Sequence, residues 1–102
     1  MAITNTALTS TASSVYTSSG TSAITTIHLC NYSGSAQTVN VYIVPSGSIA
    51  SALNIIYSNL SITSYNTQIV YAEKFILANG DSIRANCSNS GAVAVTVSSI
   101  GI

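Results

Sequence analysis

Apolar and polar residues alternate along much of the 102-residue chain, and the alternation is clearest over residues 23–31. There Ile27 and Leu29 fall on one face of an extended segment, while His28 and Cys30 fall on the other. A period of two residues is that of a β-strand with one side packed against a core. We therefore expect a strand here, with the Ile27 face buried.

The same alternation returns over residues 38–44, where Val39, Val41 and Ile43 share a face. Pro45 follows and ends the strand, because proline has no N–H to donate to a neighbouring strand. A short stretch rich in Asn, Ser and Gly separates this segment from the preceding one. The spacing predicts that the two strands pair with each other as a hairpin.

The pattern over residues 46–62 admits two interpretations. A helix would align the apolar residues Ile49, Leu53, Ile56, Tyr57 and Leu60 on one side. Alternatively, a loop leads into a strand that carries Ile56, Leu60 and Ile62 near one face. The β-branched residues and the neighbouring strands favour the strand, and a short helical turn over residues 49–53 stays open.

The C-terminal part predicts four more strands, over residues 68–72, 75–78, 82–87 and 93–98. Asn79-Gly80 predicts a type I′ hairpin turn between the second and third of these strands, because Asn and Gly both accept a positive φ. The core expected from the whole pattern consists of Ile27, Leu29, Val39, Val41, Ile43, Ile56, Leu60, Ile69, Phe75, Leu77, Ile83, Val93, Val95 and Val97.

About seven to nine short strands separated by turns are typical of an all-β antiparallel β-sandwich or a jelly-roll-like domain. We expect one such domain over residues 22–102. Residues 1–21 are expected to form an extended N-terminal arm or edge strand outside the core, because Leu8, Val15 and Tyr16 are the only large apolar residues between positions 4 and 21. Such an arm is suited to extending the sheet of a neighbouring molecule.

Charge is scarce: only 4% of the residues are charged, namely Glu73, Lys74, Asp81 and Arg84, and the formal net charge is zero. Two cations cannot form the basic surface that nucleic acids or anionic membranes require. All four charges fall within residues 73–84, so we expect Glu73/Lys74 and Asp81/Arg84 to meet as cross-strand pairs. The rest of the surface is neutral, which favours association with other copies of the chain or with a partner.

The reactive side chains predict no catalytic centre. Cys30 lies opposite the expected core face and Cys87 lies on it, so we expect two free thiols, buried or half-buried, rather than a disulfide. His28, the only histidine, shares a strand face with Cys30 and has no carboxylate near it in the sequence. Nucleophilic catalysis and a four-ligand zinc site both need more partners than this. We expect no enzyme activity, cofactor or metal.

Aromatic residues are the remaining candidates for recognition, because tyrosine combines an apolar ring with a polar tip. Of the six tyrosines, Tyr32 and Tyr65 fall in predicted loops. We expect these two to contact a protein partner or a glycan, whereas strand packing accounts for the others. The first residues contain no basic cluster and no long apolar run, so no signal peptide or membrane span is expected.

A family resemblance rests on several segments. Residues 76–88, with Gly80-Asp81 between two strands, and the valine-rich strand 93–98 resemble the C-terminal part of small virion proteins of tailed bacteriophages. Residues 2–9 and the stretch from Cys30 to Gly47 are similar to small structural proteins of marine and cyanobacterial phages. The resemblance implies a β-sandwich virion component that assembles in many copies, and it implies no catalytic or binding residue.

The resemblance implies a virion structural protein that is assembled in the host cytoplasm, and the scarcity of ionisable side chains predicts that it is not an enzyme. A capsid decoration or cement protein is expected first, with copies of itself and another virion protein as partners and a homo-oligomeric state. The alternatives are a neck, tail or fibre-associated protein, or a host-attachment module that binds carbohydrate. Assembly in a reducing cytoplasm agrees with unpaired cysteines.

Overall fold

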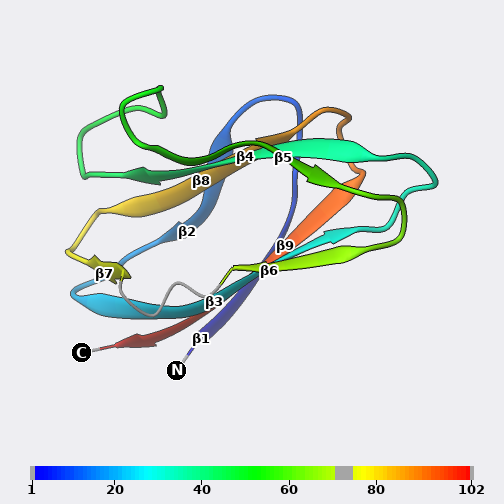
Figure 1. Ribbon diagram of the computed structural model, residues 1–102. Helices are drawn as coiled ribbons and strands as arrows, with labels where there is room; N and C mark the ends of the chain where they lie inside the picture. Colours follow the sequence, from blue (N-terminus) through cyan, green and yellow to red (C-terminus); the bar gives the residue numbers. More distant parts are fainter. Residues whose placement is uncertain (1, 71–74, 102) are drawn as a thin grey trace.

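The protein folds into nine strands that form two antiparallel sheets packed face to face, as the computed structural model of residues 2–70 and 75–101 shows (Figure 1). The first sheet contains β1 (Ala2–Ala7), β9 (Val93–Gly101), β3 (Ser22–Asn31) and β6 (Thr67–Val70), with β7 (Phe75–Leu77) also paired to β3. The second sheet contains β2 (Ser13–Thr17), β8 (Ser82–Cys87), β4 (Gln37–Val44) and β5 (Ile55–Ile62). The predicted all-β sandwich is confirmed.

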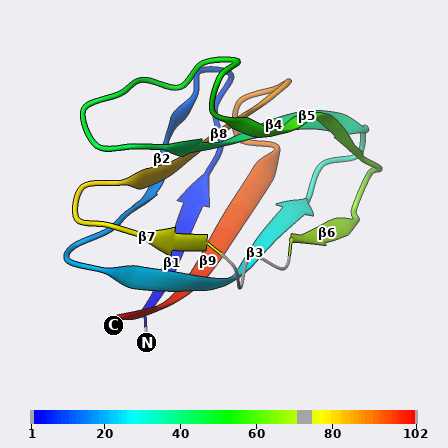
Figure 2. The same cartoon turned by 60° about the vertical axis from the view of Figure 1, so that its left-hand side comes forward.

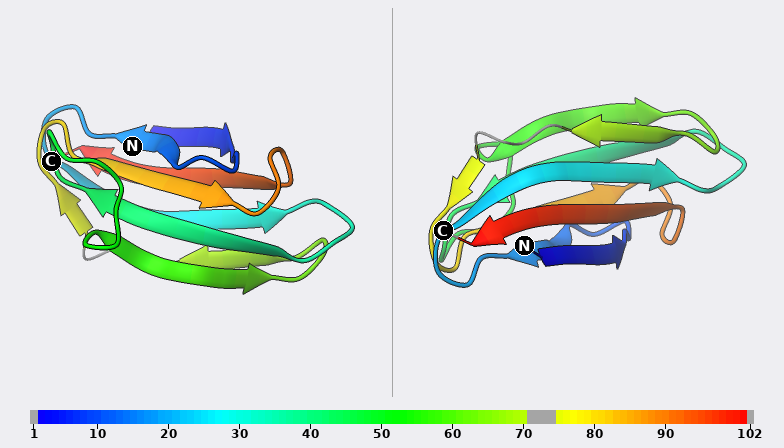
Figure 3. Two further views of the ribbon diagram at one scale, coloured as in Figure 1. Left: turned by 90° about the horizontal axis from the view of Figure 1, so that it is seen from above. Right: turned by 90° about the horizontal axis from the view of Figure 1, so that it is seen from below.

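The strand order is that of a jelly roll. Strand β1 pairs with β9, β2 with β8, β3 with β6 and β4 with β5, so the chain forms one long antiparallel ribbon that is wrapped into two sheets. Removing the short β7 leaves eight strands in the double-sheet order of this fold. Figures 2 and 3 show the consequence: the connections between β1 and β2, β3 and β4, β5 and β6, and β8 and β9 gather at one end of the sandwich.

The expected hairpin between residues 23–31 and 38–44 does not form. Strand β3 pairs with β9, β6 and β7 in the first sheet, whereas β4 pairs with β5 and β8 in the second. Both strands have one apolar face, and stacking the sheets buries both faces against each other. The connection between them is therefore a crossover from one layer to the other.

The Asn79-Gly80 turn is also a crossover, from β7 in the first sheet to β8 in the second, and the predicted type I′ hairpin is wrong. Gly80 has a φ of +89°, but Asn79 is not among the residues with positive φ. The Asp81 N–H donates to the Ala78 carbonyl at 3.1 Å. A positive φ at the third residue alone is the pattern of a type II turn, which does not have to match the twist of paired strands.

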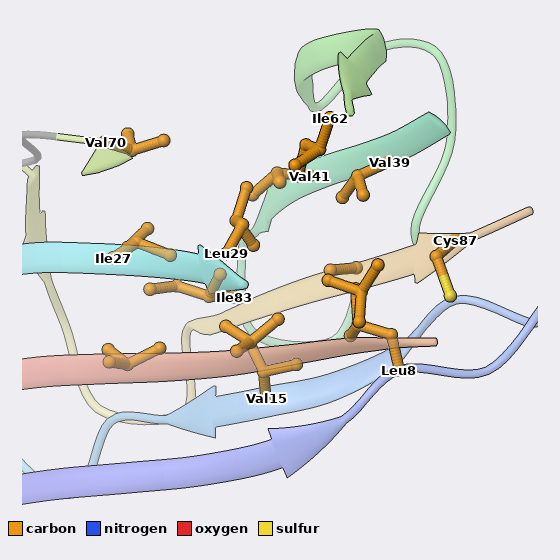
Figure 4. Close-up of a cluster of buried hydrophobic side chains, with 14 of the residues drawn as sticks. Leu8, Val15, Ile27, Leu29, Val39, Val41, Ile62, Val70, Ile83 and Cys87 are labelled. Carbon is orange, nitrogen blue, oxygen red and sulfur yellow. The ribbon is translucent and has the colours of Figure 1, made fainter. Parts of the chain in front are cut away.

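Side chains from both sheets interdigitate to form the core (Figure 4). The predicted residues that are buried are Ile27, Leu29, Val39, Val41, Leu77, Ile83, Val93, Val95 and Val97, and those that are half-buried are Ile43, Ile56, Leu60 and Phe75. The prediction that Ile69 belongs to the core is wrong. Ile69 lies on the outer face of β6 with 39% of its surface exposed. Buried residues absent from the predicted core include Leu8, Val15, Ile24, Val44, Ile62, Val70 and Ala85.

The N-terminal segment contributes directly to the core. Strand β1 is the outer strand of the first sheet and β2 is the outer strand of the second, each paired within the same chain. Both strands are edge strands, as one of the two alternatives expected. Leu8 is fully buried and Val15 is 3% exposed, so the expectation that this segment lies outside the core is wrong. A jelly roll requires this arrangement, because its first two strands cover the edges of both layers.

The ambiguous segment resolves as a loop and a strand. Residues 45–54 form hydrogen-bonded turns without a helix, and β5 begins at Ile55. The strand is irregular: its register against β4 shifts twice, and Asn59 has a φ of +54°. The strand interpretation is therefore confirmed and the helical turn is wrong.

Candidate functional site

The two tyrosines selected from the sequence lie at the same end of the sandwich. Tyr32 follows β3 and Tyr65 precedes β6, and the two loops are joined by backbone hydrogen bonds. The Tyr65 N–H donates to the Ser33 carbonyl at 3.2 Å, and the Asn31 N–H donates to the Asn66 carbonyl at 2.8 Å. This pairing follows from the antiparallel contact between β3 and β6, which brings the two loops side by side.

A buried asparagine holds these loops in place. Asn31 is fully buried, and its amide group donates to the carbonyls of Ser35, Ile62 and Thr63 at 2.9, 3.0 and 3.2 Å. Its side-chain oxygen accepts from the backbone N–H of Ser33 at 3.0 Å and from the Ser33 hydroxyl at 2.7 Å. One side chain therefore satisfies polar groups of both loops, and its bond to the Ile62 carbonyl lies where water is excluded.

A buried glutamine extends the network to a third loop. Gln37, 1% exposed, accepts through its side-chain oxygen from the Ser88 hydroxyl at 2.6 Å and from the Asn89 N–H at 3.0 Å. Its amide nitrogen donates to the hydroxyl of Ser35 at 3.3 Å. Together Asn31 and Gln37 fix the connections after β3, β5 and β8 at this end.

Sequence reasoning missed both amides, although a signal was present. Asn31 has the same parity as Leu29, and Gln37 has the same parity as Val39, so the alternation points both toward the interior. A polar residue at an inward position near the end of a strand indicates a side chain that satisfies loop backbone.

The tyrosine rings project from this fixed end toward solvent. Tyr32 is 50% exposed and Tyr65 is 74% exposed. Tyr65 adopts a φ of +58°, which is unfavourable for a residue with a side chain and is maintained by the surrounding bonds. Its hydroxyl lies against Gly34, where an added Cβ would sit 3.4 Å away. The loops therefore present two exposed phenols on a pre-ordered, uncharged surface, which suits stacking and hydrogen bonding to a neutral partner.

The residues considered for chemistry lie elsewhere and do not form a catalytic group. His28 is exposed on the outer face of β3, beside Thr96 and Ile69. Cys30 is half-buried on the same face, and Cys87 is buried among the core residues; both thiols are free. Within residues 2–70 and 75–101 no group of His, Cys, Asp and Glu side chains could hold a metal ion.

Of the four charged residues, Asp81 and Arg84 lie in the described part of the chain. The Asp81 carboxylate accepts from the backbone N–H groups of Ser46 and Ala78, each at 2.9 Å, and so connects two loops. Arg84 donates through Nε to the Ser82 hydroxyl at 3.3 Å. The predicted cross-strand pairing involves Glu73 and Lys74, which lie outside the described residues.

At the opposite end, the loop between β4 and β5 presents two bare apolar side chains. Leu53 is 98% exposed and Ile49 is 75% exposed, and both line a shallow hollow together with Pro45. Asn54 orders this loop, because its side chain donates to the Ile49 carbonyl at 2.8 Å and accepts from the Ser51 N–H at 3.0 Å.

The outer face of the first sheet also exposes isoleucines. Ile3 (68% exposed), Ile76 (56%) and Ile100 (44%) join Ile69 on this face. No described residue of the first sheet is Asp, Glu, Lys or Arg. The sheet therefore offers a neutral, partly apolar surface.

Comparison with known proteins adds no relative: no protein-family model, curated protein or solved structure matches the chain. Among residues 2–70 and 75–101, no helix is long and apolar enough to cross a membrane.

Proposed function

We propose that the chain is a non-enzymatic structural protein that assembles in many copies through protein–protein contacts. The observation that carries the proposal is the outer face of the first sheet, where isoleucines are exposed and charged residues are absent from the described strands. Apolar side chains exposed on one uncharged sheet face favour contact with another protein over contact with water. A net charge of zero provides no long-range repulsion between copies, so association is not opposed.

We place this assembly in the virion of a tailed bacteriophage, as a capsid decoration or cement protein. Two observations support the proposal: the resemblance of residues 76–88 and 93–98 to small phage virion proteins, and a jelly-roll topology, which is common in viral capsid domains. The topology is an argument by analogy, because the same fold also serves lectins and enzymes. A neck, tail or fibre-associated position is the alternative within the same particle.

Copy number tests both the assembly and its place. Purified particles are analysed by quantitative mass spectrometry against a capsid protein of known copy number. A decoration protein is expected in hundreds of copies, whereas a neck or tail position gives about three to eighteen, as closed symmetric rings require. Absence of the chain from intact particles would refute the virion proposal.

A second function, carbohydrate binding in host attachment, is favoured by the position of Tyr32 and Tyr65. Both rings are exposed, and they project from loops that Asn31 and Gln37 fix at one end of the sandwich. A pre-ordered pair of aromatic rings loses little conformational freedom when it binds a flat neutral ligand.

A glycan array separates this second function from pure assembly. Specific binding that is lost in both Tyr32→Ala and Tyr65→Ala would support it. The matched control is Tyr57→Ala, which removes an exposed tyrosine from β5 outside these loops. Binding that is absent, or that all three variants reduce equally, would contradict a glycan site at this end.

A further inference from the structure

Strand β1 is an open sheet edge with unusually regular geometry. It pairs with β9 without interruption from Ala2 to Ala7, and no strand within residues 2–70 and 75–101 pairs with its other side. The remaining outer strands are irregular or short: the register of β2 shifts within the strand, that of β5 shifts twice, β6 has four residues and β7 has three. Figure 3 shows β1 as the outermost strand of its layer when the sandwich is seen from below.

The pairing with β9 determines which backbone groups of β1 face outward. Just beyond the strand, Leu8 donates its N–H to the Val93 carbonyl at 2.8 Å and accepts from the Gly91 N–H at 2.9 Å. Both of its polar backbone groups therefore point toward the β9 side. Because this direction alternates along an antiparallel strand, the N–H and C=O groups of Ile3, Asn5 and Ala7 point away from β9.

Strand β1 lacks the features that commonly prevent another strand from pairing with a sheet edge. Natural sheet edges are commonly protected by charged side chains, proline or a β-bulge. Strand β1, with the sequence AITNTA, has none of the three. The side chains of Ile3, Asn5 and Ala7 are exposed on the outer face, so an approaching strand meets no charged side chain from β1.

We propose that two copies of this chain pair antiparallel through β1, about a two-fold axis that passes beside Asn5. In this register Asn5 faces Asn5 of the second copy, and Ile3 faces Ala7 of the second copy. Each outward N–H and C=O of these three residues then has a partner. The first sheets of the two copies become one continuous sheet, with their uncharged outer faces on the same side.

The side chains suit this register as well as the backbone does. On the inner face Thr4 lies opposite Thr6 of the second copy, and threonine pairs are favourable across antiparallel strands. On the outer face the exposed Ile3 packs beside a small alanine, and the two asparagines meet at the axis. The Asn5 side-chain oxygen already accepts from the Thr96 hydroxyl at 2.9 Å, which orients the amide on this face.

The test uses charge at the two-fold axis. Sedimentation velocity of the wild-type chain is expected to reveal a species of twice the 10.4 kDa chain mass. The measurement covers concentrations up to about 1 mM, because a one-strand interface is small. Asn5→Lys and Asn5→Asp are each expected to sediment as monomers, because like charges directly opposite each other destabilise a strand pair. An equal mixture of the two variants is expected to restore the dimer, because the opposed charges are then complementary.

Thr67→Lys and Thr67→Asp are the matched controls, since Thr67 is exposed on the outer face of β6 at the far edge of the same sheet. Both are expected to dimerise like the wild type, and circular dichroism verifies that all four variants are folded. A monomeric wild type would overturn the proposal, as would a dimer that Asn5→Lys leaves intact or a mixture that stays monomeric.

The β1 pairing names one surface through which copies meet in the proposed assembly, and it rests on the proposed virion function only for its biological setting. The β1 pairing and the virion function can be refuted separately. A monomer in solution overturns the β1 pairing, whereas the copy number in particles decides the virion proposal.

Discussion

Replacing Asn31 by alanine should destabilise the protein strongly, because its buried amide connects the loops that carry Tyr32 and Tyr65. The change removes three donated hydrogen bonds, to the carbonyls of Ser35, Ile62 and Thr63, and two that the side chain accepts from Ser33. The bond to Ile62 lies between buried atoms, where water cannot replace it, so its loss costs about 1 kcal/mol. The others are partly exposed, and water replaces them at about 0.5 kcal/mol or less each.

The expected total is about 3 kcal/mol, which is a large part of the roughly 5–15 kcal/mol by which domains of this size are stable. Urea denaturation measures it: the midpoint should fall while the slope with denaturant stays unchanged. A second variant, Asn31→Asp, keeps the accepting oxygen but places an oxygen against the three carbonyls. It is expected to be at least as destabilising as alanine at neutral pH.

Asn89→Ala is the control, because that side chain is exposed and the Asn89 backbone bond to Gln37 is retained. Its effect should stay within about 0.5 kcal/mol, as for other surface substitutions. A free energy of unfolding for Asn31→Ala within that same margin of the wild type would refute the reasoning. It would mean that the backbone contacts and the Gln37 side chain hold these loops without Asn31.

Two further expectations concern single side chains. Gly80→Ala and Gly47→Ala both place a side chain at positive φ, and each should lose at least about 1 kcal/mol in urea denaturation. Gly80→Ala should lose more, because its Cβ would also lie 3.1 Å from the Ser46 Cβ, which rotation of the Ser46 side chain does not move. Equal losses in the two variants would contradict that crowding. Hydrogen bonding, chiefly with Ser22, lowers the pKa of Tyr16, so Ser22→Ala should raise that pKa in an ultraviolet absorbance titration. Because the pKa of Tyr16 is lower in the folded state than in the unfolded state, ionised Tyr16 adds stability only at alkaline pH. Ser22→Ala should therefore reduce the free energy of unfolding more at alkaline pH than at pH 7. An unchanged titration curve would refute the assignment of this pKa shift to Ser22.

Short-range pattern was enough to place most of the strands. Alternation located β3, β4, β8 and β9 to within a few residues and identified buried faces such as that of Ile27 and Leu29. This succeeds because the pleat of a strand requires successive side chains to point to opposite sides, whatever the strand pairs with. The same parity correctly assigned Cys87 to the core face and Cys30 to the outer face.

The alternation of residues failed to predict burial where burial depends on neighbouring strands. Ile69 fits a strand but lies on an outer face, since the short β6 exposes it on the far side of the sheet. Leu8 and Val15 lie in a weakly apolar stretch and are buried because their strands cover the two edges of the sandwich. The fixing role of Asn31 was not foreseen, because the carbonyls that it satisfies at Ile62 and Thr63 are distant in the sequence.

By itself, then, the sequence determined that the chain forms β-strands with one buried face, that its surface carries almost no charge, and that Tyr32 and Tyr65 lie in loops. Only the tertiary structure decided which strands pair, that both expected hairpins are crossovers between layers, and that the two tyrosine loops meet. The physical reason is that alternation specifies which side of a strand is apolar, whereas the partner strand is selected by how all the apolar sides can be covered at once. In this chain the jelly roll covers them, and it leaves β1 as a regular open edge.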